Sequence, residues 1–334
     1  MIQCDMHEML SAGFEPSKIK IANKSFSFHF ILCNTDSNHG FLNHLHNFDC
    51  WADRIGLKFL VFAMDEKFSK YLDKRGKVKS FFWEGFSGKP ASEKAGQFRS
   101  DYDNLIVNRK LEATLAVMML GYDIIFVDVD IAILRDPIPY LLFEGVEYVH
   151  SVNEICPLRG DGVFDSFLME GNTGFYYARS TSNNIKIWTE AIAAIPLYPG
   201  LDDQTIFWNT VRNSKSIHIR PLLSCPNSTS PPFKKLKGLG VDIYKNDWIT
   251  CGLDVCLFSS GAISESKVHR QYREGLERLG PGMTGVTVHA NFMSGGQKKE
   301  EAMTRHGFWL YNNSTGTDEN SCMERGENNS ILIQ

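Results

Sequence analysis

The sequence predicts an α/β fold with a mostly parallel central sheet flanked by helices. Apolar runs of strand length at 26–33, 58–63 and 124–127 alternate with segments of helical periodicity at 41–55 and 105–120. Strands and helices that alternate at this spacing are typical of parallel strands joined by right-handed helical crossovers. The chain has 334 residues, of which 43% are hydrophobic and 22% charged, and this composition allows a sizeable core.

One large domain accounts for most of the chain. Residues 1–24 show no strong periodicity and are expected to be a lead-in, whereas 312–334 are polar, rich in asparagine and expected to form a flexible tail. Between them, 25–311 contain no internal repeat and no linker long enough to require a second domain. We therefore expect a single α/β domain over 25–311.

The first elements set up the sheet. Phe26–Cys33 alternates and then becomes wholly apolar, as a buried strand does, and 34–38 has turn composition. A helix over Phe41–Ile55 leads to a second strand at Lys58–Ala63, and a further helix opens at Asp65. This order predicts two parallel strands with a helical crossover.

The next segment leads to the most informative part of the sequence. Lys77–Gly96 mixes aromatic residues with glycine, lysine and proline and is expected to be an irregular loop. Leu105–Leu120 has apolar residues at helical spacing, and Ile124–Val127 is a short apolar run that predicts a fully buried strand. Pro137 and Pro139 are expected to stop the strand.

The second half continues the alternation with further strands and helices. We expect strands at Glu147–Val152, Asn172–Ala178, Ile217–Pro221 and Val286–Asn291, the last closing the sheet, and helices at Ile185–Ile195, from Leu201, and at Glu300–Leu310. A loop at Ser294–Lys299 is expected before the last helix.

Charge, hydropathy and cysteine usage exclude several classes of protein. A net charge of -4 argues against a general nucleic-acid binder, which is usually basic. The longest largely apolar stretch, Ala113–Leu120, is too short to span a membrane, and Met1–Asp5 does not begin a secretory signal. The eight cysteines include no Cys-x-x-Cys pair, so a structural zinc site is not expected. Disulfides and buried free thiols are both compatible with this pattern.

Two carboxylates follow the apolar run at 124–127. Asp128 and Asp130 are separated by one residue, and on a strand such residues point to the same face. Two like charges at the end of a buried strand repel each other and lose hydration, and a divalent cation removes both penalties. The alternative is a pair of solvated carboxylates where a strand meets a loop. The apolar run before the pair and Arg135-Asp136-Pro137 after it favour a metal site.

Polar clusters at other expected strand ends complete a candidate site, because ligands of open α/β sheets bind beyond the carboxyl ends of the strands. His289 is either a metal ligand or a structural histidine, and the glycines and lysine that follow it favour a ligand near a phosphate. The clusters are Asn34-Thr35-Asp36, Asp128-Val129-Asp130, Asn172-Thr173-Gly174, and His289 with Lys298. Together they suit a nucleotide diphosphate bound through a cation.

These motifs resemble the nucleotide-diphospho-sugar transferase family, which includes plant retaining xylosyl-, arabinosyl- and galactosyltransferases. Residues 124–131 and the Leu134-Arg135-Asp136-Pro137 that follows look like the metal-binding block of that family. The agreement continues at 172–175, at Asp203-Gln204, and at His289-Ala290-Asn291 with Gly295 and Lys298. The resemblance implies the GT-A fold, which is a Rossmann-like α/β architecture.

The resemblance also implies the metal ligands. Asp130 would hold the metal directly, Asp128 would contact the metal or the ribose, and His289 would be the third protein ligand. The cofactor would be Mn2+ or Mg2+, and an imidazole ligand suits Mn2+ better. The cation would stabilise the negative charge that develops on the departing diphosphate.

Other residues would bind the donor. Lys298, with Lys299 as a further candidate, would share the charge of the diphosphate, and Asn172 would contact the donor sugar or nucleoside. Asn34 and Thr35 resemble contacts to the uridine side, and capping of a turn explains them nearly as well.

Asp203 and Gln204 match a pair that lies beside the donor sugar in that family, where they would position and stabilise an oxocarbenium-like centre. Asp202 has the alternative role of capping a helix. Arg109 and Lys110 lie on the helix before the metal strand and could reach the donor, and a solvated helix face is the alternative for one of them.

The implied activity is transfer of a sugar, with retention, from a nucleotide-diphosphate donor, expected to be a UDP-sugar, to a glycan or glycoprotein acceptor. No nucleic-acid partner and no membrane span are expected. The implied compartment is the Golgi lumen, with the cytoplasm as the alternative because an anchor is missing from this sequence. Two departures from the family pattern bear on the acceptor. Ala132-Ile133 replaces an aromatic residue, and Phe292 stands where tryptophan is usual.

Three other functions are alternatives to this one. A phosphatase of the haloacid-dehalogenase type would carry a hydroxyl residue where this chain has Ala132. A nucleotidyltransferase would need a glycine-rich basic loop after the first strand, and Cys33–Gly40 is not one. A non-catalytic sugar-nucleotide-binding homologue would keep the scaffold, and the intact set of metal ligands argues against it.

Overall fold

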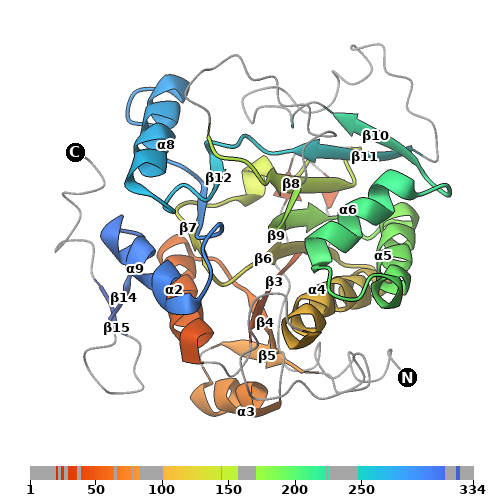
Figure 1. Ribbon diagram of the computed structural model, residues 1–334, viewed down its shortest axis with the longest axis horizontal. Coiled ribbons are helices and arrows are strands. Elements are labelled where there is room, and N and C mark those ends of the chain that lie inside the picture. The colour runs from red at the N-terminus through yellow and green to blue at the C-terminus, as the bar shows by residue number, and fades with distance from the viewer. Residues whose placement is uncertain are drawn as a thin grey trace.

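The protein, seen in a computed structural model, is built around a mixed sheet of eight strands (Figure 1). In spatial order the strands are β10 (His218–Leu222), β11 (Asp247–Gly252), β8 (Tyr148–Val152), β9 (Gly171–Ala178), β6 (Asp123–Val127), β3 (His29–Thr35), β4 (Leu60–Ala63) and β5 (Lys79–Phe81). The structure describes the backbone of residues 20–21, 24–25, 29–35, 39–63, 66–76, 78–82, 101–143, 145–156, 171–222, 225, 247–312 and 321–323.

The sheet is parallel except at one strand. β9 is antiparallel to both of its neighbours, β6 and β8, while every other pair in the sheet is parallel. Because parallel strands end at the same edge, the carboxyl ends of β3 and β6 and the start of β9 meet there. The expected α/β class with a mostly parallel sheet is confirmed, and the topology agrees with the GT-A fold that the resemblance implied.

A second sheet of three strands corrects the expectation that the segment at 286–291 closes the main sheet. It contains β12 (Phe258–Ser260), β13 (Thr287–His289) and β7 (Ile131–Ile133), in the order β12-β13-β7. β13 is parallel to β12 and antiparallel to β7. The chain turns at Asp130 and re-enters as β7, and this unpredicted short strand supplies the edge with which β13 pairs.

Helices cover both faces of the main sheet (Figure 1). Side chains alternate along β6, so that Ile124 and Phe126 pack toward α4 and α5, and Ile125 and Val127 pack toward α2 and α3. The helices are α2 (His39–Ile55), α3 (Glu66–Arg75), α4 (Asp101–Met119), α5 (Ser182–Ala194), α6 (Asp203–Asn213), α8 (Ser266–Leu279) and α9 (Gly296–Arg305), with short 3-10 helices η1 (Ile138–Tyr140) and η2 (Ile195–Leu197). Among the helices that the structure describes, none combines the length and apolar character needed to cross a bilayer.

Several elements differ from the expectations. β11, β12 and α8 were not predicted, although Val268, Tyr272, Leu276 and Leu279 recur at helical spacing within α8. Most of the expected loop at 294–299 is instead the first turn of α9. Gly295, the residue before this helix, has a positive φ of 89°, which glycine adopts readily. The helix ends at Arg305, earlier than expected. β5 lies within the segment 77–96 that was predicted to be an irregular loop, and 83–96 lie outside the described residues.

Three disulfides join distant parts of the chain. Cys50 on α2 is bonded to Cys322, Cys156 after β8 to Cys256 before β12, and Cys225 to Cys251 on β11. The first of these also fixes part of the polar C-terminal segment, where β15 (Ser321–Cys322) pairs with β14 (Tyr311–Asn312). The alternative of free thiols is therefore wrong for these six cysteines.

We expect reduction to destabilise the fold by about 2–5 kcal/mol for each bond, because each bond restricts the unfolded chain. Thermal unfolding with and without reductant, together with alkylation of free thiols and peptide mapping, measures both effects. Free thiols at these cysteines in the oxidised protein, or an unfolding temperature that reductant does not change, would contradict the disulfides.

Candidate active site

Asp128 and Asp130 lie where the chain leaves the main sheet. β6 ends at Val127, and the Ile131 N–H donates to the Asp128 carbonyl at 3.2 Å, which closes a turn over Val129 and Asp130. The sequence predicted that a continuous strand would place the two carboxylates on one face. The turn brings them together instead.

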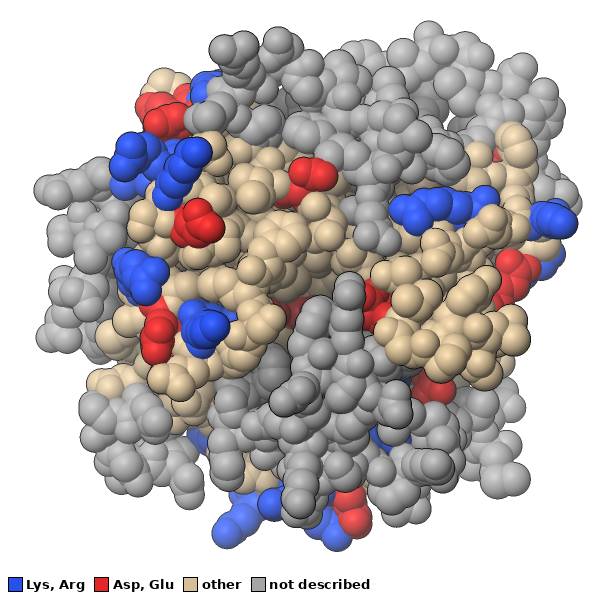
Figure 2. All heavy atoms as spheres, viewed as in Figure 1, with Lys and Arg blue, Asp and Glu red and all other residues tan. Residues whose placement is uncertain are grey.

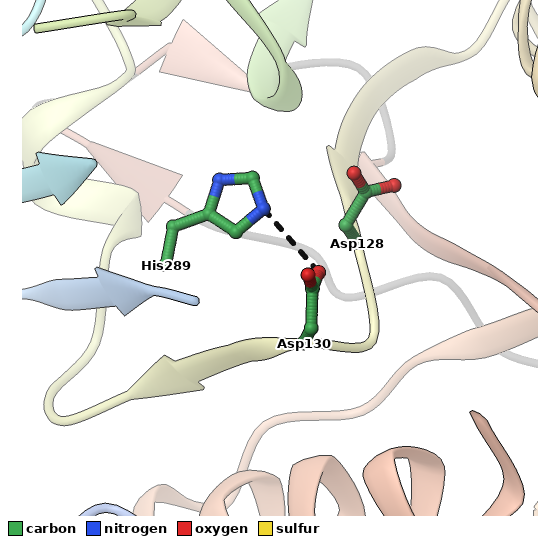
Figure 3. Close-up of side chains that lie close together, drawn as sticks. All are labelled: Asp128, Asp130 and His289. Carbon is green, nitrogen blue, oxygen red and sulfur yellow. Dashed lines mark ion pairs between the residues drawn. The ribbon is translucent and has the colours of Figure 1, made fainter. Parts of the chain in front are cut away.

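A cluster of three possible metal ligands forms at this turn (Figure 3). Ligand atoms of Asp128, Asp130 and His289 all lie within 4.8 Å of one another. His289 is opposite Ile131 in the β13–β7 register, and its Nε2 lies 3.3 Å from Asp130 Oδ1. In Figure 3 the imidazole, at the end of β13, and the Asp130 carboxylate, on the turn before β7, point toward each other.

Gly174 on β9 leaves room for this cluster. A Cβ at this position would lie 2.5 Å from His289 Cε1, 2.7 Å from Asp128 Oδ2 and 2.8 Å from Asn172 Oδ1. These separations are shorter than real Cβ contacts, so any side chain here would displace the ligands. Glycine is required for its size at this strand position.

The three residues fit a divalent cation. Two carboxylates and one imidazole are ligands that Mn2+ accepts. His289 Nε2 faces Asp130, so it is the ring nitrogen that a cation in this cluster would use. Figure 2 shows acidic side chains in the hollow at the centre of the viewed face.

Lys110 on α4 joins Asp128 to Asp203. Its Nζ lies 3.0 Å from Asp128 Oδ1 and 3.7 Å from Asp203 Oδ2. Burial alone would lower the pKa of Lys110, but Asp128 and Asp203 outweigh it and hold the pKa above its usual value. Arg109 and Lys110 are only 4% and 9% exposed, so the alternative of a solvated helix face is wrong for both.

Asp203 and Gln204 begin α6 beside this ion pair. Burial raises the pKa of Asp203 to about 6, with Lys110 opposing the rise and Asp128 adding to it. Gln204 Oε1 accepts a hydrogen bond from the Thr173 N–H at 3.3 Å, which places it against β9. Asp202 caps the helix, because its Oδ1 accepts from the Thr205 N–H at 2.7 Å, so the capping alternative is confirmed.

Lys299 contacts the metal cluster, whereas Lys298 is exposed on α9. Lys299 Nζ lies 2.6 Å from Asp130 Oδ2. Burial alone would raise the pKa of Asp130, but Lys299 and His289 hold it well below its usual value. His44 on α2 supports this end of α9, since its Nε2 is 3.0 Å from the Gly296 carbonyl. The sequence assigned no role to His44, and no local pattern marks it.

Three amide side chains adjoin the cluster. Asn153 Oδ1 accepts hydrogen bonds from Asn172 Nδ2 at 3.2 Å and from Asn291 Nδ2 at 3.3 Å. Asn172 Oδ1 in turn accepts from the Gly174 N–H at 2.8 Å. Asn153 was not identified from the sequence, because its partners lie 19 and 138 residues away.

Asn34 and Thr35 lie at the carboxyl end of β3, next to β6. Their backbone is therefore at the edge that holds the cluster, while their side chains and Asp36 lie outside the described residues. Their assignment to the uridine side of a donor stays a prediction.

Residues 57–303 match the nucleotide-diphospho-sugar transferase family. The match covers most of the chain, and it includes Asp128, Asp130, Asp203 and His289. The chain belongs to this family of glycosyltransferases, as the motifs predicted.

Two curated proteins are similar in sequence. The chain is 25% identical over 260 residues to beta-arabinofuranosyltransferase RAY1 of Arabidopsis thaliana, covering 77% of this chain and 43% of that protein. It is also 25% identical over 251 residues to the UDP-galactose:fucoside alpha-3-galactosyltransferase of Dictyostelium discoideum, covering 73% of this chain and 34% of that protein. The chain thus spans less than half the length of these relatives.

Solved structures of glycosyltransferases are more distant. The bifunctional glycosyltransferase WbbM has a TM-score of 0.45 at 7% identity, covering 86% of this chain and 51% of that one. The galactosyltransferase LgtC in complex with donor and acceptor sugar analogs has a TM-score of 0.34 at 13% identity, covering 73% and 94%. Likeness at this level says nothing of what this chain binds.

We predict that Gly174→Ala weakens Mn2+ binding by about 10–100-fold, the range seen when the surroundings of metal ligands are disturbed. The added Cβ would push His289 and Asp128 apart. Titration of the free Mn2+ signal by electron paramagnetic resonance measures the affinity. Gly280→Ala is the matched control, because a Cβ there meets only Met283 at an ordinary 3.6 Å. Wild-type Mn2+ affinity in a folded Gly174→Ala variant would show that the cluster does not bind the cation.

Proposed function

We propose that this chain transfers a sugar, with a divalent cation and with retention of configuration, from a UDP-sugar to a glycan or glycoprotein acceptor. The observation that carries the proposal is the cluster of Asp128, Asp130 and His289, which lies at the carboxyl edge of the sheet between two lysines. Family membership supports a nucleotide-diphosphate donor. The name of the Dictyostelium relative, which specifies UDP-galactose, supports uridine.

Asp128, Asp130 and His289 would hold the cation, Mn2+ in preference to Mg2+, which when bound would neutralise charge on the diphosphate oxygens. Lys299 would neutralise part of the charge on the diphosphate, because its ammonium group would leave Asp130 and pair with a phosphate oxygen. Lys298 lies on the same helix turn but is exposed, so we assign the contact to Lys299. The assignment differs from the sequence expectation, which put Lys298 first.

Asp203 and Gln204 would act on the sugar itself. The Asp203 carboxylate would stabilise positive charge at the anomeric carbon as the bond from that carbon to the phosphate oxygen breaks. Gln204, oriented by the Thr173 N–H, and Asn172, fixed by Asn153, would orient the donor sugar. The acceptor oxygen forms the new bond on the same face, and its proton passes to the departing phosphate.

We also propose that the protein works in an oxidising compartment such as the Golgi lumen. The three disulfides support this proposal, since such bonds persist in secretory compartments and are rare in the cytosol. The mapping of free thiols described above, applied to protein from its native cells, tests it. Reduced cysteines there would favour the cytoplasmic alternative.

The activity is tested with a panel of UDP-sugars and Mn2+, with release of UDP by donor hydrolysis as the readout and the anomeric product identified by NMR. We expect release from at least one donor, loss of it with a chelator, and a decrease of about 10²–10³-fold in Asp130→Asn. Asp136→Asn, at an exposed aspartate outside the cluster, should behave as wild type. Metal-independent release, or full activity in Asp130→Asn, would contradict the proposal, and UDP binding without turnover would favour a non-catalytic homologue.

Lys299→Ala should separate two affinities. Because Lys299 occupies Asp130 Oδ2 at 2.6 Å, its removal should strengthen binding of Mn2+ alone several-fold. The same change should weaken binding of UDP in the presence of Mn2+ by about tenfold, through loss of a charge-assisted hydrogen bond to phosphate. Calorimetry of both ligands measures this, with Lys298→Ala as the matched control. If Lys299→Ala and Lys298→Ala changed the Mn2+ and UDP affinities equally, the assignment of the phosphate contact to Lys299 would be wrong.

A further inference from the structure

Phe292 has a backbone conformation that is unusual for its type. Of the described residues other than glycine, it alone has a positive φ, at 60°. Its large apolar side chain is also 52% exposed. A residue with a Cβ is disfavoured in the left-handed region, and a bulky aromatic strongly so. Such strain persists where the surroundings enforce it, and it is concentrated at functional sites.

The ring of Phe292 lies on the backbone of Gly261. A Cβ at Gly261 would overlap the ring, so the absence of a side chain there is what lets the ring pack against the chain. Gly261 itself has a φ of 65°, and its N–H donates to the His289 carbonyl at 3.1 Å. The ring is therefore supported by a residue that is hydrogen-bonded to a member of the metal cluster.

The position of Phe292 is on the side of the cluster away from β3. Asn291, the residue before it, is hydrogen-bonded at 3.3 Å to Asn153 just beyond β8, and Asn153 also holds Asn172 on β9. β8 and β9 lie on one side of β6 in the main sheet, and β3 lies on the other. The expected uridine contacts, Asn34 and Thr35, are on β3. Phe292 is thus at the end of the site that the nucleoside would not occupy.

We propose that the Phe292 ring is the stacking surface for a sugar ring of the acceptor. One face of an aromatic ring that is half exposed beside a polar site offers an apolar plane, and the C–H face of a pyranose or furanose is its natural counterpart. The inference rests on the proposed function and adds to it the subsite at which the acceptor binds. The left-handed backbone turns the ring onto Gly261 and holds it rigid, so that little side-chain entropy is lost when a sugar binds.

A purely structural role predicts something different. A ring that served only to cover Gly261 would be expected to bury most of its surface, whereas half of it is accessible. The other exposed large apolar residues in the described part of the chain are on or next to α4, η2 and α8, namely Met119, Leu197, Tyr198 and Leu279. None of them combines exposure with a positive φ.

Phe292→Gly tests the proposal, because φ 60° is favourable for glycine and the variant should fold with an unfolding temperature equal to or above that of the wild type. The probes are methyl glycosides of galactose, fucose, xylose and arabinofuranose, with binding measured by saturation-transfer NMR in the presence of UDP and Mn2+. We expect at least one glycoside to bind the wild type and at least tenfold weaker binding to Phe292→Gly. Phe292→Trp should keep the glycoside binding of the wild type, because it retains an aromatic ring. Leu197→Gly, at a distant exposed site, should not alter this binding.

The readouts keep this inference separate from the proposed function. UDP affinity with Mn2+ and hydrolysis of the donor should be the same in Phe292→Gly and wild type within about twofold, since Phe292 is not one of the possible metal ligands. If glycoside binding is unchanged in Phe292→Gly, or if no glycoside in the panel binds the wild type, the acceptor subsite is wrong even where UDP binds. If the wild type does not bind UDP with Mn2+, the proposed function fails instead.

Discussion

The carboxylates of Asp130 and Asp203 are buried and that of Asp128 is partly buried, and the three can remain charged only with cations beside them. A buried charge without a partner costs several kcal/mol, and neighbouring like charges add to this penalty. Lys110 offsets it between Asp128 and Asp203, and Lys299 together with His289 offsets it at Asp130. The site is therefore electrostatically balanced by two lysines on helices and one histidine on β13.

The two sheets bring these charged residues together from distant parts of the sequence. The main sheet delivers Asp128 at the end of β6, and the second sheet delivers His289, because β13 pairs with the strand that follows the turn at Asp130. α9 begins a few residues after β13 and brings Lys299 to Asp130. Gly174 keeps β9 from filling the space between the ligands. A Cβ there would lie 2.5 Å from His289 Cε1 and 2.7 Å from Asp128 Oδ2, so the strand end, the turn and the imidazole can pack together only around a glycine.

Local patterns in the sequence were sufficient for the parallel core and for the acidic pair. The apolar run before Asp128 is a property of neighbouring residues, and so is the capping geometry of Asp202. Pairings between distant segments were not accessible in the same way. The second sheet depends on a three-residue strand at 131–133 that carries almost no periodic signal, and the segment at 286–291 was therefore assigned to the wrong sheet.

The same limit applies to individual site residues. Spacing alone did not show that Lys299, rather than its neighbour Lys298, turns toward Asp130, because this depends on where α9 begins. Asn153 is part of no sequence motif, and its role follows from its hydrogen bonds to Asn172 and Asn291, which are distant from it in the sequence. Phe292 was noticed as a departure from a family pattern, but its strained backbone and its support by Gly261 are tertiary properties.

The measurement that tests the account most directly is the anomalous scattering of manganese in crystals of the protein grown with Mn2+ and UDP. The account predicts one strong peak bound by Asp130 and His289, with diphosphate oxygens on its open side and the Lys299 ammonium moved from Asp130 to a phosphate. Absence of a peak there, with Lys299 still paired to Asp130 and UDP not bound at the sheet edge, would contradict it.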